Sequence, residues 1–378
     1  MARILMSKAA VGPEEEEALI RAVRSGWVTF TGPEVTAFED EVRARVGVAH
    51  AVALASGTAA LHLGLLGLGA KPGTCVVVSS MTFAATANAV AYTGAEPVFV
   101  DSAGAGGNVD PELMIHSVRA LQMEGREVVA AIPVDLFGRC VDYGVLEPGL
   151  AELGVPILAD SAESLGSSFM GRPAGSFGHA AAFSFNGNKI MTTSGGGMLV
   201  TDDFELAEKA RYLCNQARQP TPWYEHTEIG FNYRLSNILA ALGRAQLGKL
   251  DEFISRRREI RDMYREGFSD IGGLAFLGAE DDQSGTIENC WLTALDLGSE
   301  AGVTADEMVK HLDANDIEGR HIWKPMHLQP VWSGARSFVS GESEALFRRG
   351  ITLPSGAGLT NDEISRVIDA VRDKMAGD

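Results

Sequence analysis

Short apolar, β-branched runs alternate with stretches of small, helix-forming residues between about residue 50 and residue 201. This rhythm is typical of strand–helix–strand crossover units, which build a largely parallel sheet covered by helices on both faces. Only about ten residues separate the last two runs, so these two could form an antiparallel edge. The expected strands are AVALA (51–55), CVVVSS (75–80), PVFVD (97–101), VVAAIPVD (128–135), PILAD (156–160), AAAFSF (180–185) and GGMLVT (196–201).

The helical pattern lengthens after the last of these strands. One long helix is expected over about 236–265, where leucines recur at helical spacing and three arginines follow. This helix should connect a large domain, residues 1–250, to a smaller C-terminal α+β domain, residues 251–378. The sequence therefore predicts an α/β protein of two unequal domains.

Charge and composition exclude several classes of partner. The chain has 32 Lys and Arg against 50 Asp and Glu among 378 residues, a net charge of -18 that repels nucleic acids and anionic membranes. No apolar run approaches the roughly 20 residues of a membrane-spanning helix, and the N-terminus turns acidic before a signal-peptide core could form. We expect a cytoplasmic protein with no nucleic-acid or membrane partner. The four cysteines are far apart, without metal-ligand spacing, so no structural metal is expected.

One lysine stands apart from the others. Lys189 follows the expected strand AAAFSF and an Asn-Gly-Asn turn, and it precedes small polar residues and three glycines. A lysine at the carboxyl end of a buried strand can be desolvated, which frees its amine to condense with a carbonyl. The alternative on this segment alone is a structural lysine that pairs with a buried acid.

Three further positions bear on that alternative. Thr58 follows Ser56-Gly57 at the head of a helix, where free N–H groups can seat a phosphate, although Thr58 could equally be a plain N-cap. Asp160 ends a central strand and needs a cationic partner there. Phe83 follows another strand end and could stack on a planar ring, although a lone phenylalanine is more often core. An imine-forming amine, a phosphate seat, a partner for a pyridinium nitrogen and a stacking face are the requirements of pyridoxal 5′-phosphate (PLP).

Longer blocks carry a resemblance to a known family. The segments SGTAALHLGLLGLG, ADSAESLGSSFMGRPAGSFGHAAAFSFNGNKIMTTSGGGMLVT and IGFNYRLSNILAALGRAQLGKLDEF resemble the DegT/DnrJ/EryC1/StrS family of PLP-dependent sugar aminotransferases. The resemblance covers most of residues 15–260 and extends more weakly to the C-terminus. It implies fold type I, the aspartate aminotransferase architecture, and a homodimer in which each subunit completes the other's active site.

The resemblance also implies roles for individual residues. Lys189 matches the lysine that forms the imine with PLP, Asp160 the partner of the pyridinium nitrogen, and Glu163 the residue beside the ring hydroxyl, where many members carry His or Gln. Phe83 would stack on the ring, and Asn232 would reach the phosphate in the other subunit. The expected phosphate contacts are Gly57, Thr58 and Ser184. Lysine at 189 places the chain with the aminotransferases, because the dehydratase branch has histidine there. Another departure is TSGGG in place of TxGEGG.

The segment HIWKPMHLQPVW (321–332) bears on the substrate. It resembles the KPMHLQP segment of the branch that makes 4-amino sugars of the bacillosamine type, which implies a UDP-linked 4-keto-6-deoxy-N-acetylhexosamine as substrate and glutamate as amino donor. His327 would lie near the substrate, and Lys324 would meet a nucleotide phosphate or the donor carboxylate. As bare chemistry His327 is more often a packing residue and Lys324 a surface charge. SGWVTFTGPEV (25–35) also matches a family region near the nucleotide sugar.

Two other functions stay open at this point. One is a transaminase for a dTDP- or GDP-linked keto sugar, of the GDP-perosamine synthase kind. The other is a binding protein that keeps PLP or the fold without turnover. A phosphate-binding loop is set aside, because GRAQLGK (243–249) lacks the hydroxyl residue and lies within a helical pattern. No GxGxxG follows an expected strand, which argues against a nicotinamide dehydrogenase.

Overall fold

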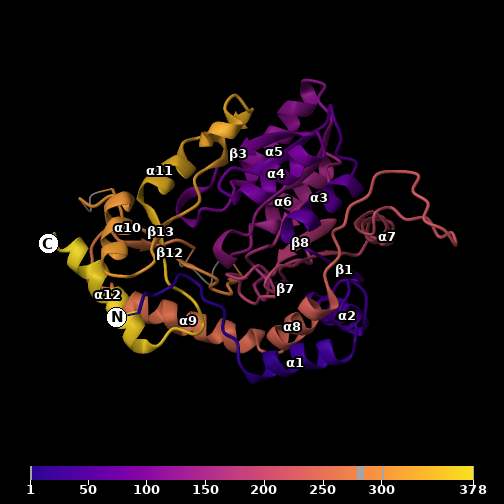
Figure 1. The fold of residues 1–378 in the computed structure, drawn as a ribbon. Helices are drawn as coiled ribbons and strands as arrows, with labels where there is room; N and C mark the ends of the chain where they lie inside the picture. The colour runs from indigo at the N-terminus through magenta and orange to yellow at the C-terminus, as the bar shows by residue number, and fades with distance from the viewer. Residues whose placement is uncertain (1, 279–284, 300–301, 378) are drawn as a thin grey trace.

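A mixed β-sheet forms the centre of the computed structural model, which describes residues 2–278, 285–299 and 302–377 (Figure 1). Two four-stranded ladders join through parallel bridges between β4 and β5, which gives the strand order β1-β9-β8-β5-β4-β2-β3-β14. β9 alone of these strands runs against the others. The strands are β1 (His50–Leu54), β2 (Cys75–Ser79), β3 (Glu96–Val100), β4 (Val128–Ile132), β5 (Leu158–Asp160), β8 (Ala180–Ser184), β9 (Gly197–Thr201) and β14 (Ser337–Phe338).

All seven expected strands form, and the largely parallel α/β sheet is confirmed. The antiparallel pairing of the last two is also confirmed, because Ser184 of β8 is opposite Gly197 of β9. Their expected position at the edge is wrong. The first strand returns beside β9, where Leu54 is also opposite Gly197, so β1 forms the edge and β9 is inside the sheet.

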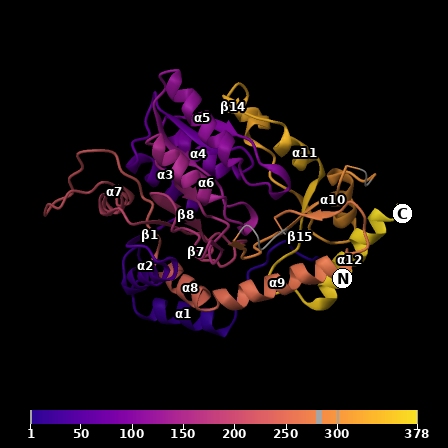
Figure 2. The ribbon, with the colours of Figure 1, turned by 180° about the vertical axis from the view of Figure 1, so that it is seen from behind.

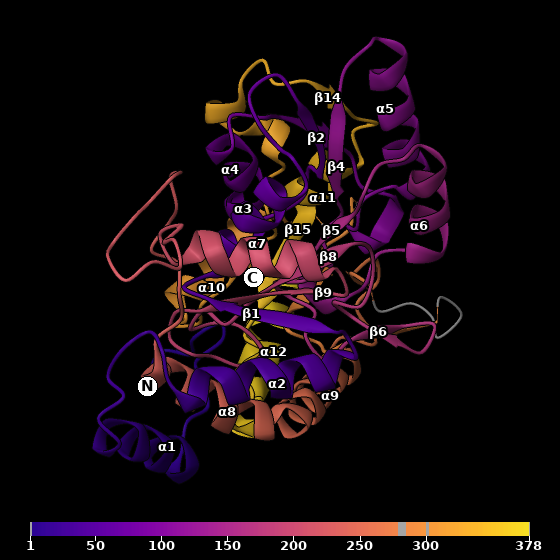
Figure 3. The same ribbon diagram turned by 90° about the vertical axis from the view of Figure 1, so that its right-hand side faces the viewer.

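Helices cover both faces of the sheet, as expected from strands that are apolar on both sides. Ala51 and Ala53 of β1 pack into one hydrophobic cluster, whereas Val52 and Leu54 pack into another. Figure 3 shows α2 and α7 on opposite sides of β1. The first face carries α2 (Pro33–Val46), α5 (Pro111–Met123), α6 (Tyr143–Glu152) and α8 (Asn237–Gly248), and the second carries α3 (Gly57–Gly67), α4 (Ala84–Tyr92) and α7 (Phe204–Cys214).

The long helix expected over 236–265 is two helices. Lys249 separates α8 from α9 (Leu250–Gly267), with φ −105° and ψ 5°, which is outside the helical range. The Lys249 ammonium lies 3.2 Å from the carboxylates of both Glu14 and Glu15 on α1 (Pro13–Arg24). Figure 2 shows α8 and α9 following one another along one side of the molecule, with α1 beside α8. The break arises where a distant helix pairs with the chain, which the local pattern cannot show.

A second core lies in the C-terminal part of the chain. Helices α9, α10 (Ala305–Ala314) and α12 (Asn361–Met375) pack on an antiparallel sheet, and N-terminal Ile4 joins them. This separate core supports our proposed boundary near residue 250, although β14 returns to the large sheet beside β3. The antiparallel sheet has the order β10 (Ala275–Phe276), β12 (Thr293–Asp296), β15 (Gly350–Leu353) and β13 (Arg320–His321). The remaining strands and α-helix of the described residues are β6 (Ser168–Phe169), β7 (Arg172–Pro173), β11 (Thr286–Ile287) and α11 (Glu342–Arg349).

Candidate active site

A cavity of about 300 Å³ lies at the carboxyl ends of β5 and β8 and the N-terminus of α3. Seven of the ten residues singled out from the sequence line it, although they span more than 130 positions of the chain. These seven are Gly57, Thr58, Phe83, Asp160, Glu163, Ser184 and Lys189. Ligands of open α/β sheets bind at this edge, so the cavity is the candidate active site.

The Lys189 side chain ends inside the cavity. Its backbone N–H donates to the Asn186 carbonyl at 3.0 Å, which closes the turn after β8. The ammonium lies 3.6 Å from Glu163 Oε1 and 4.0 Å from the centroid of the Trp291 ring. Only 12% of the side chain is exposed. The structure therefore contains the buried acid that the alternative role of Lys189 requires, namely Glu163. It also contains a cavity beside the amine, which the imine-forming role requires.

Asp160 ends β5 with its carboxylate buried at the cavity. Oδ2 accepts a hydrogen bond from Thr86 Oγ1 at 2.7 Å, and Oδ1 accepts one from the Ala162 N–H at 3.2 Å. Burial raises the pKa of Asp160, while the bonds from Thr86 and Ala162 and the charge of Lys189 lower it. A buried carboxylate in this setting is stabilised by a further cationic N–H group, which fits a pyridinium nitrogen.

Glu163 is a second buried carboxylate in the cavity. Its Oε2 accepts a hydrogen bond from the Phe137 N–H at 2.7 Å, and its Oε1 faces Lys189. Burial raises the pKa of Glu163, and the Lys189 ammonium lowers it. Glu163 can thus hold a proton or a negative charge beside the lysine amine.

The N-terminus of α3 borders the cavity beside Ser184. Ser56 is the N-cap, because its Oγ accepts from the Ala59 N–H at 3.0 Å, so the reading of Thr58 as the N-cap is wrong. The first N–H groups of a helix have no acceptor within the helix, which leaves them available to an anion. A Cβ atom at Gly57 would lie 2.9 Å from Ser184 Cβ, so the close approach of helix and strand requires glycine there.

The third glycine of TSGGG has a steric role in the same place. A Cβ atom at Gly197 would lie 2.3 Å from the Ser56 carbonyl carbon and 2.4 Å from the Gly57 nitrogen. Any side chain there would displace the turn from β1 into α3. Gly197 therefore allows β9 to pack directly against Ser56 and Gly57 at the N-terminus of α3.

Four residues expected at or near the cofactor or substrate lie at the rim or beyond it. Phe83 lines the cavity with 58% of its surface exposed, and its ring is edge-on to Trp323 with centroids 5.8 Å apart. His327 and Lys324 do not line the cavity. His327 Nδ1 instead lies 2.6 Å from Ser80 Oγ, and burial lowers the pKa of this imidazole. Asn232 lies on the exposed segment between α7 and α8, outside the cavity of its own chain.

Among the lining residues that sequence reasoning missed are four whose side chains bear on the site. Thr86 comes from α4, and Trp291, Arg320 and Trp323 come from the C-terminal part of the chain. The contacts that bring Thr86 to Asp160 and Trp291 to Asn188 join positions far apart in the sequence, so no local motif reveals them. The adjacency of Trp323 to the KPMHLQP-like segment was the one usable signal.

The fold and the site together define a class of enzyme. A lysine and a buried aspartate at the ends of parallel strands, facing a helix N-terminus across one cavity, meet the requirements of PLP. This arrangement is that of a PLP-dependent aminotransferase of fold type I.

Comparisons with known proteins identify the family. The chain belongs to the DegT/DnrJ/EryC1/StrS aminotransferase family, whose match covers residues 10–372. It is 41% identical over 373 residues to EpsN of Bacillus subtilis (strain 168), covering 98% of this chain and 95% of that protein. It is 34% identical over 378 residues to a GDP-perosamine synthase of Caulobacter vibrioides, covering 98% of this chain and 97% of that protein.

The structural comparison agrees with this assignment. The crystal structure of a DegT DnrJ EryC1 StrS aminotransferase from Brucella abortus superimposes with a TM-score of 0.88 at 31% identity, covering 97% of this chain and 96% of that one. The protein is thus a PLP-dependent aminotransferase. Within the described ranges, no helix is both long and apolar enough to cross a membrane.

Proposed function

We propose that the protein transfers the amino group of glutamate to C4 of a UDP-linked 4-keto-6-deoxy-N-acetylhexosamine and so forms a UDP-4-amino sugar. One observation carries the choice of substrate. The segment that resembles the bacillosamine-type branch, residues 321–332, lines the cavity with Trp323. Arg320, which precedes the segment in the chain, also lines the cavity. The part of the chain that carries this resemblance therefore borders the space where a substrate would meet Lys189.

The cavity residues divide the chemistry among themselves. PLP, when bound, supplies an aldehyde for covalent attachment and an electron-accepting ring. Lys189 is the attachment point, and its free Nζ takes the proton from the α-carbon of glutamate and later delivers one to C4 of the sugar. Asp160 keeps the ring nitrogen protonated, and the N–H groups of Gly57 and Thr58 seat the phosphate beside Ser184.

Arg320 is our candidate for binding the carboxylate of the amino donor. It lines the cavity from β13, and its guanidinium pairs with Glu318 at the protein surface. A planar guanidinium binds a carboxylate through two parallel hydrogen bonds. Arg320 thus replaces Lys324 in this proposed role, because Lys324 does not line the cavity.

A second groove, of about 380 Å³, is our candidate for binding the nucleoside diphosphate part of the substrate. Arg218 and Arg234 line it, together with Phe30 of the SGWVTFTGPEV segment. The two guanidinium groups lie over aromatic rings, Arg218 at 4.4 Å from the centroid of Tyr224 and Arg234 at 5.3 Å from that of Phe30. Two guanidinium groups in one groove match the charge of a diphosphate, and the rings offer a face to a base.

Homodimer formation is also part of the proposal. The segment between α7 and α8 projects from the body of the subunit (Figure 1). Trp223, Tyr224 and Ile229 on this segment are exposed, Ile229 to 86%. Apolar exposure on this scale is typical of a surface that another chain covers. Asn232 lies on the same segment and would reach the partner's phosphate, as the family resemblance implies.

A GDP-linked keto sugar is the second candidate substrate. The 34% identity to the GDP-perosamine synthase of Caulobacter vibrioides over nearly the whole chain favours it. A turnover assay with glutamate and each of the UDP-, GDP- and dTDP-linked 4-keto sugars decides between them, with NMR of the product. We expect the highest kcat/KM with the UDP sugar, and a higher value with the GDP sugar would overturn this choice.

The role of Lys189 has its own experiment. Borohydride reduction of the holoenzyme, followed by peptide mapping, should attach the reduced cofactor to Lys189 and to no other lysine. The variant Lys189→Arg should bind PLP without becoming labelled. A label on another lysine would refute the proposed chemistry, whichever sugar is the substrate.

A further inference from the structure

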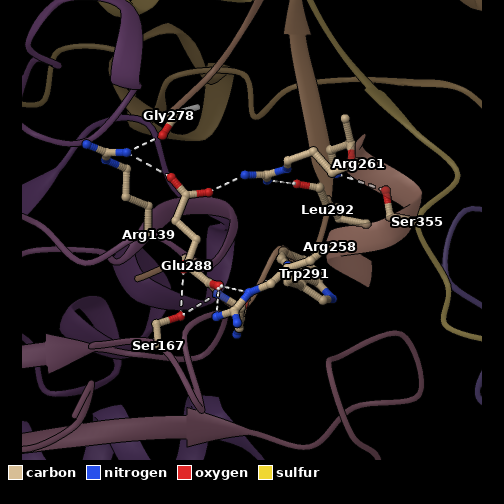
Figure 4. Close-up of polar contacts among 12 residues, drawn as sticks. Arg139, Ser167, Arg258, Arg261, Gly278, Glu288, Trp291, Leu292 and Ser355 are labelled. Atoms are coloured by element: carbon tan, nitrogen blue, oxygen red, sulfur yellow. Dashed lines mark hydrogen bonds and ion pairs between the residues drawn. The ribbon is translucent and has the colours of Figure 1, made fainter. Parts of the chain in front are cut away.

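The segment Glu288–Leu292 connects α9 to the turn that carries Glu163 and to the turn that carries Lys189. Its residues have no role in the function derived above. The Glu288 carboxylate pairs with Arg139 at 2.8 Å and also with Arg261 of α9 (Figure 4). Arg261 is buried, and the side chains of Glu288 and Arg139 are only 10% and 19% exposed, so solvent screens these pairs less than it screens surface pairs. The start of the segment is therefore fixed between the large sheet and α9.

Arginines of α9 also hold the main chain of this segment. Arg258 Nη2 donates to the Glu288 carbonyl at 2.8 Å, and Arg261 Nη2 donates to the Leu292 carbonyl at 3.1 Å. Arg257 donates to the Trp291 carbonyl between them. Three carbonyl groups within five residues are thus bound to one helix, which gives the segment a defined position.

Asn289 links this position to the turn after β5 that carries Glu163. Its Nδ2 donates to the Glu163 carbonyl at 2.8 Å and to the Leu165 carbonyl at 3.0 Å. Its Oδ1 accepts from the Trp291 N–H at 2.8 Å. A single buried amide therefore ties the backbone at Glu163 to the backbone at Trp291.

Trp291 makes the corresponding contact with the lysine. Its Nε1 donates to the Asn188 carbonyl at 2.7 Å, next to Lys189 in the chain. Its ring lies 4.0 Å from the Lys189 ammonium, which is 3.6 Å from Glu163 Oε1. Trp291 is fully buried, so this cation–π contact forms in a desolvated setting, where such contacts are strongest.

We propose that Trp291 is a positioning residue for Lys189: its indole N–H fixes the turn before the lysine, and its ring face holds the free amine beside Glu163. The inference rests on the proposed role of Lys189 in proton transfer. A lysine side chain has four rotatable bonds, and its amine must occupy one place whenever it is free to move a proton. Because α9 holds Trp291 through the segment, the C-terminal core defines that place.

Two substitutions separate the contributions of the indole. Trp291→Phe keeps a ring face and removes the N–H, whereas Trp291→Leu removes both. We expect kcat to fall about 5- to 30-fold in the leucine variant and less in the phenylalanine variant. KM for the sugar and for glutamate should stay within about twofold, because the groups proposed to bind both substrates are unchanged. Trp332→Phe, whose ring packs on Phe99 outside the cavity, should match the wild type.

A measurement on the apo-protein tests the geometry without turnover. Lysines are methylated reductively with ¹³C-formaldehyde, and Lys189→Arg assigns the signal of Lys189. A methylated amine on the Trp291 face should give a signal displaced upfield by the ring current, and Trp291→Leu should remove the displacement while Trp332→Phe keeps it.

Three results would overturn the inference. They are an undisplaced Lys189 signal in the wild type, an unchanged kcat in Trp291→Leu, or a loss of kcat that only follows loss of folded, cofactor-loaded protein. The phenylalanine variant keeps the last test decisive if the leucine variant does not fold. Borohydride labelling of a lysine other than 189 would refute the proposed function separately, and it leaves the ring-current test of the contact unaffected.

Discussion

Thr86→Val should impair catalysis by removing the principal hydrogen bond of Asp160. Thr86 Oγ1 donates to Asp160 Oδ2 at 2.7 Å and is itself 2.7 Å from Thr82 Oγ1. Both Thr86 and Asp160 are buried, and valine has nearly the same shape as threonine. The substitution therefore deletes one donor to a carboxylate without opening a cavity.

The magnitude follows from the charge and burial of the acceptor. A hydrogen bond to a charged group contributes about 1.5–3 kcal/mol, and each 1.4 kcal/mol corresponds to about tenfold in rate. If the full amount acts on the transition state, kcat falls by about 10- to 150-fold. Burial already raises the pKa of Asp160 and the Thr86 bond lowers it, so the variant should raise this pKa further. Since the carboxylate is the active form, the acid limb of the kcat–pH profile should move to higher pH.

The control is Thr93→Val at the C-terminal end of the same helix. Thr93 is buried, and its Oγ1 donates to the Val90 carbonyl at 2.7 Å, outside the cavity. Both variants lose a buried hydroxyl donor, so losses of stability should be comparable in urea unfolding. Only Thr86→Val should change kcat and the acid limb. Wild-type kcat and an unmoved acid limb in Thr86→Val would refute the assignment of Asp160 as the group that keeps the ring nitrogen protonated.

Three further substitutions test the fold and the anion seat. Burial raises the pKa of Asp101, but hydrogen bonds from the start of α11 outweigh this effect and lower the pKa to about 2. Asp101→Asn should therefore lower the free energy of unfolding by about 2 kcal/mol at neutral pH, measured by urea unfolding. The variant should also lack the loss of stability that the wild type shows as pH falls from about 4 towards 2. Burial raises the pKa of Asp135 to about 6, so the apo-protein should lose about 3 kcal/mol as pH rises from about 4 to 7, and Asp135→Asn should remove that slope. Gly57→Ala would place a Cβ atom 2.9 Å from Ser184 Cβ and should weaken PLP binding severalfold in a dialysis titration, whereas Gly248→Ala, with open space around its Cβ position, should not.

The strands were predictable because each is buried on both faces. Residues that alternate between the two clusters, such as Val77 and Val78, are all apolar, which produces continuous runs in the sequence. The order of the strands was not predictable in this way, because it depends on where the chain returns. Thus β1 lies outside β9, and the two-residue strand β14 joins β3 from more than 230 positions away. The break at Lys249 likewise depends on Glu14 and Glu15.

The candidate site divides along the same line. Lys189 and Asp160 were identifiable because they follow buried strands, where an ionisable group needs a reason to be. Thr86 and Trp291 were not identifiable, because their hydrogen-bond partners lie 74 and 103 positions away in the chain. A local pattern reports which residues end a strand but not which side chains meet there.

This division separates the chemistry from the choice of substrate. Asp160 is in register with Ala182 of the neighbouring parallel strand, so the aspartate and the turn that carries Lys189 are held together by the ladder of the sheet. Arg320 and Trp323 reach the cavity from β13 and the loop that follows it, outside that ladder. Changes in these segments are expected to alter the shape of the cavity more than the position of the aspartate, which the sheet holds. Substitutions in these segments are therefore expected to change which sugar is accepted more than they change the cofactor chemistry.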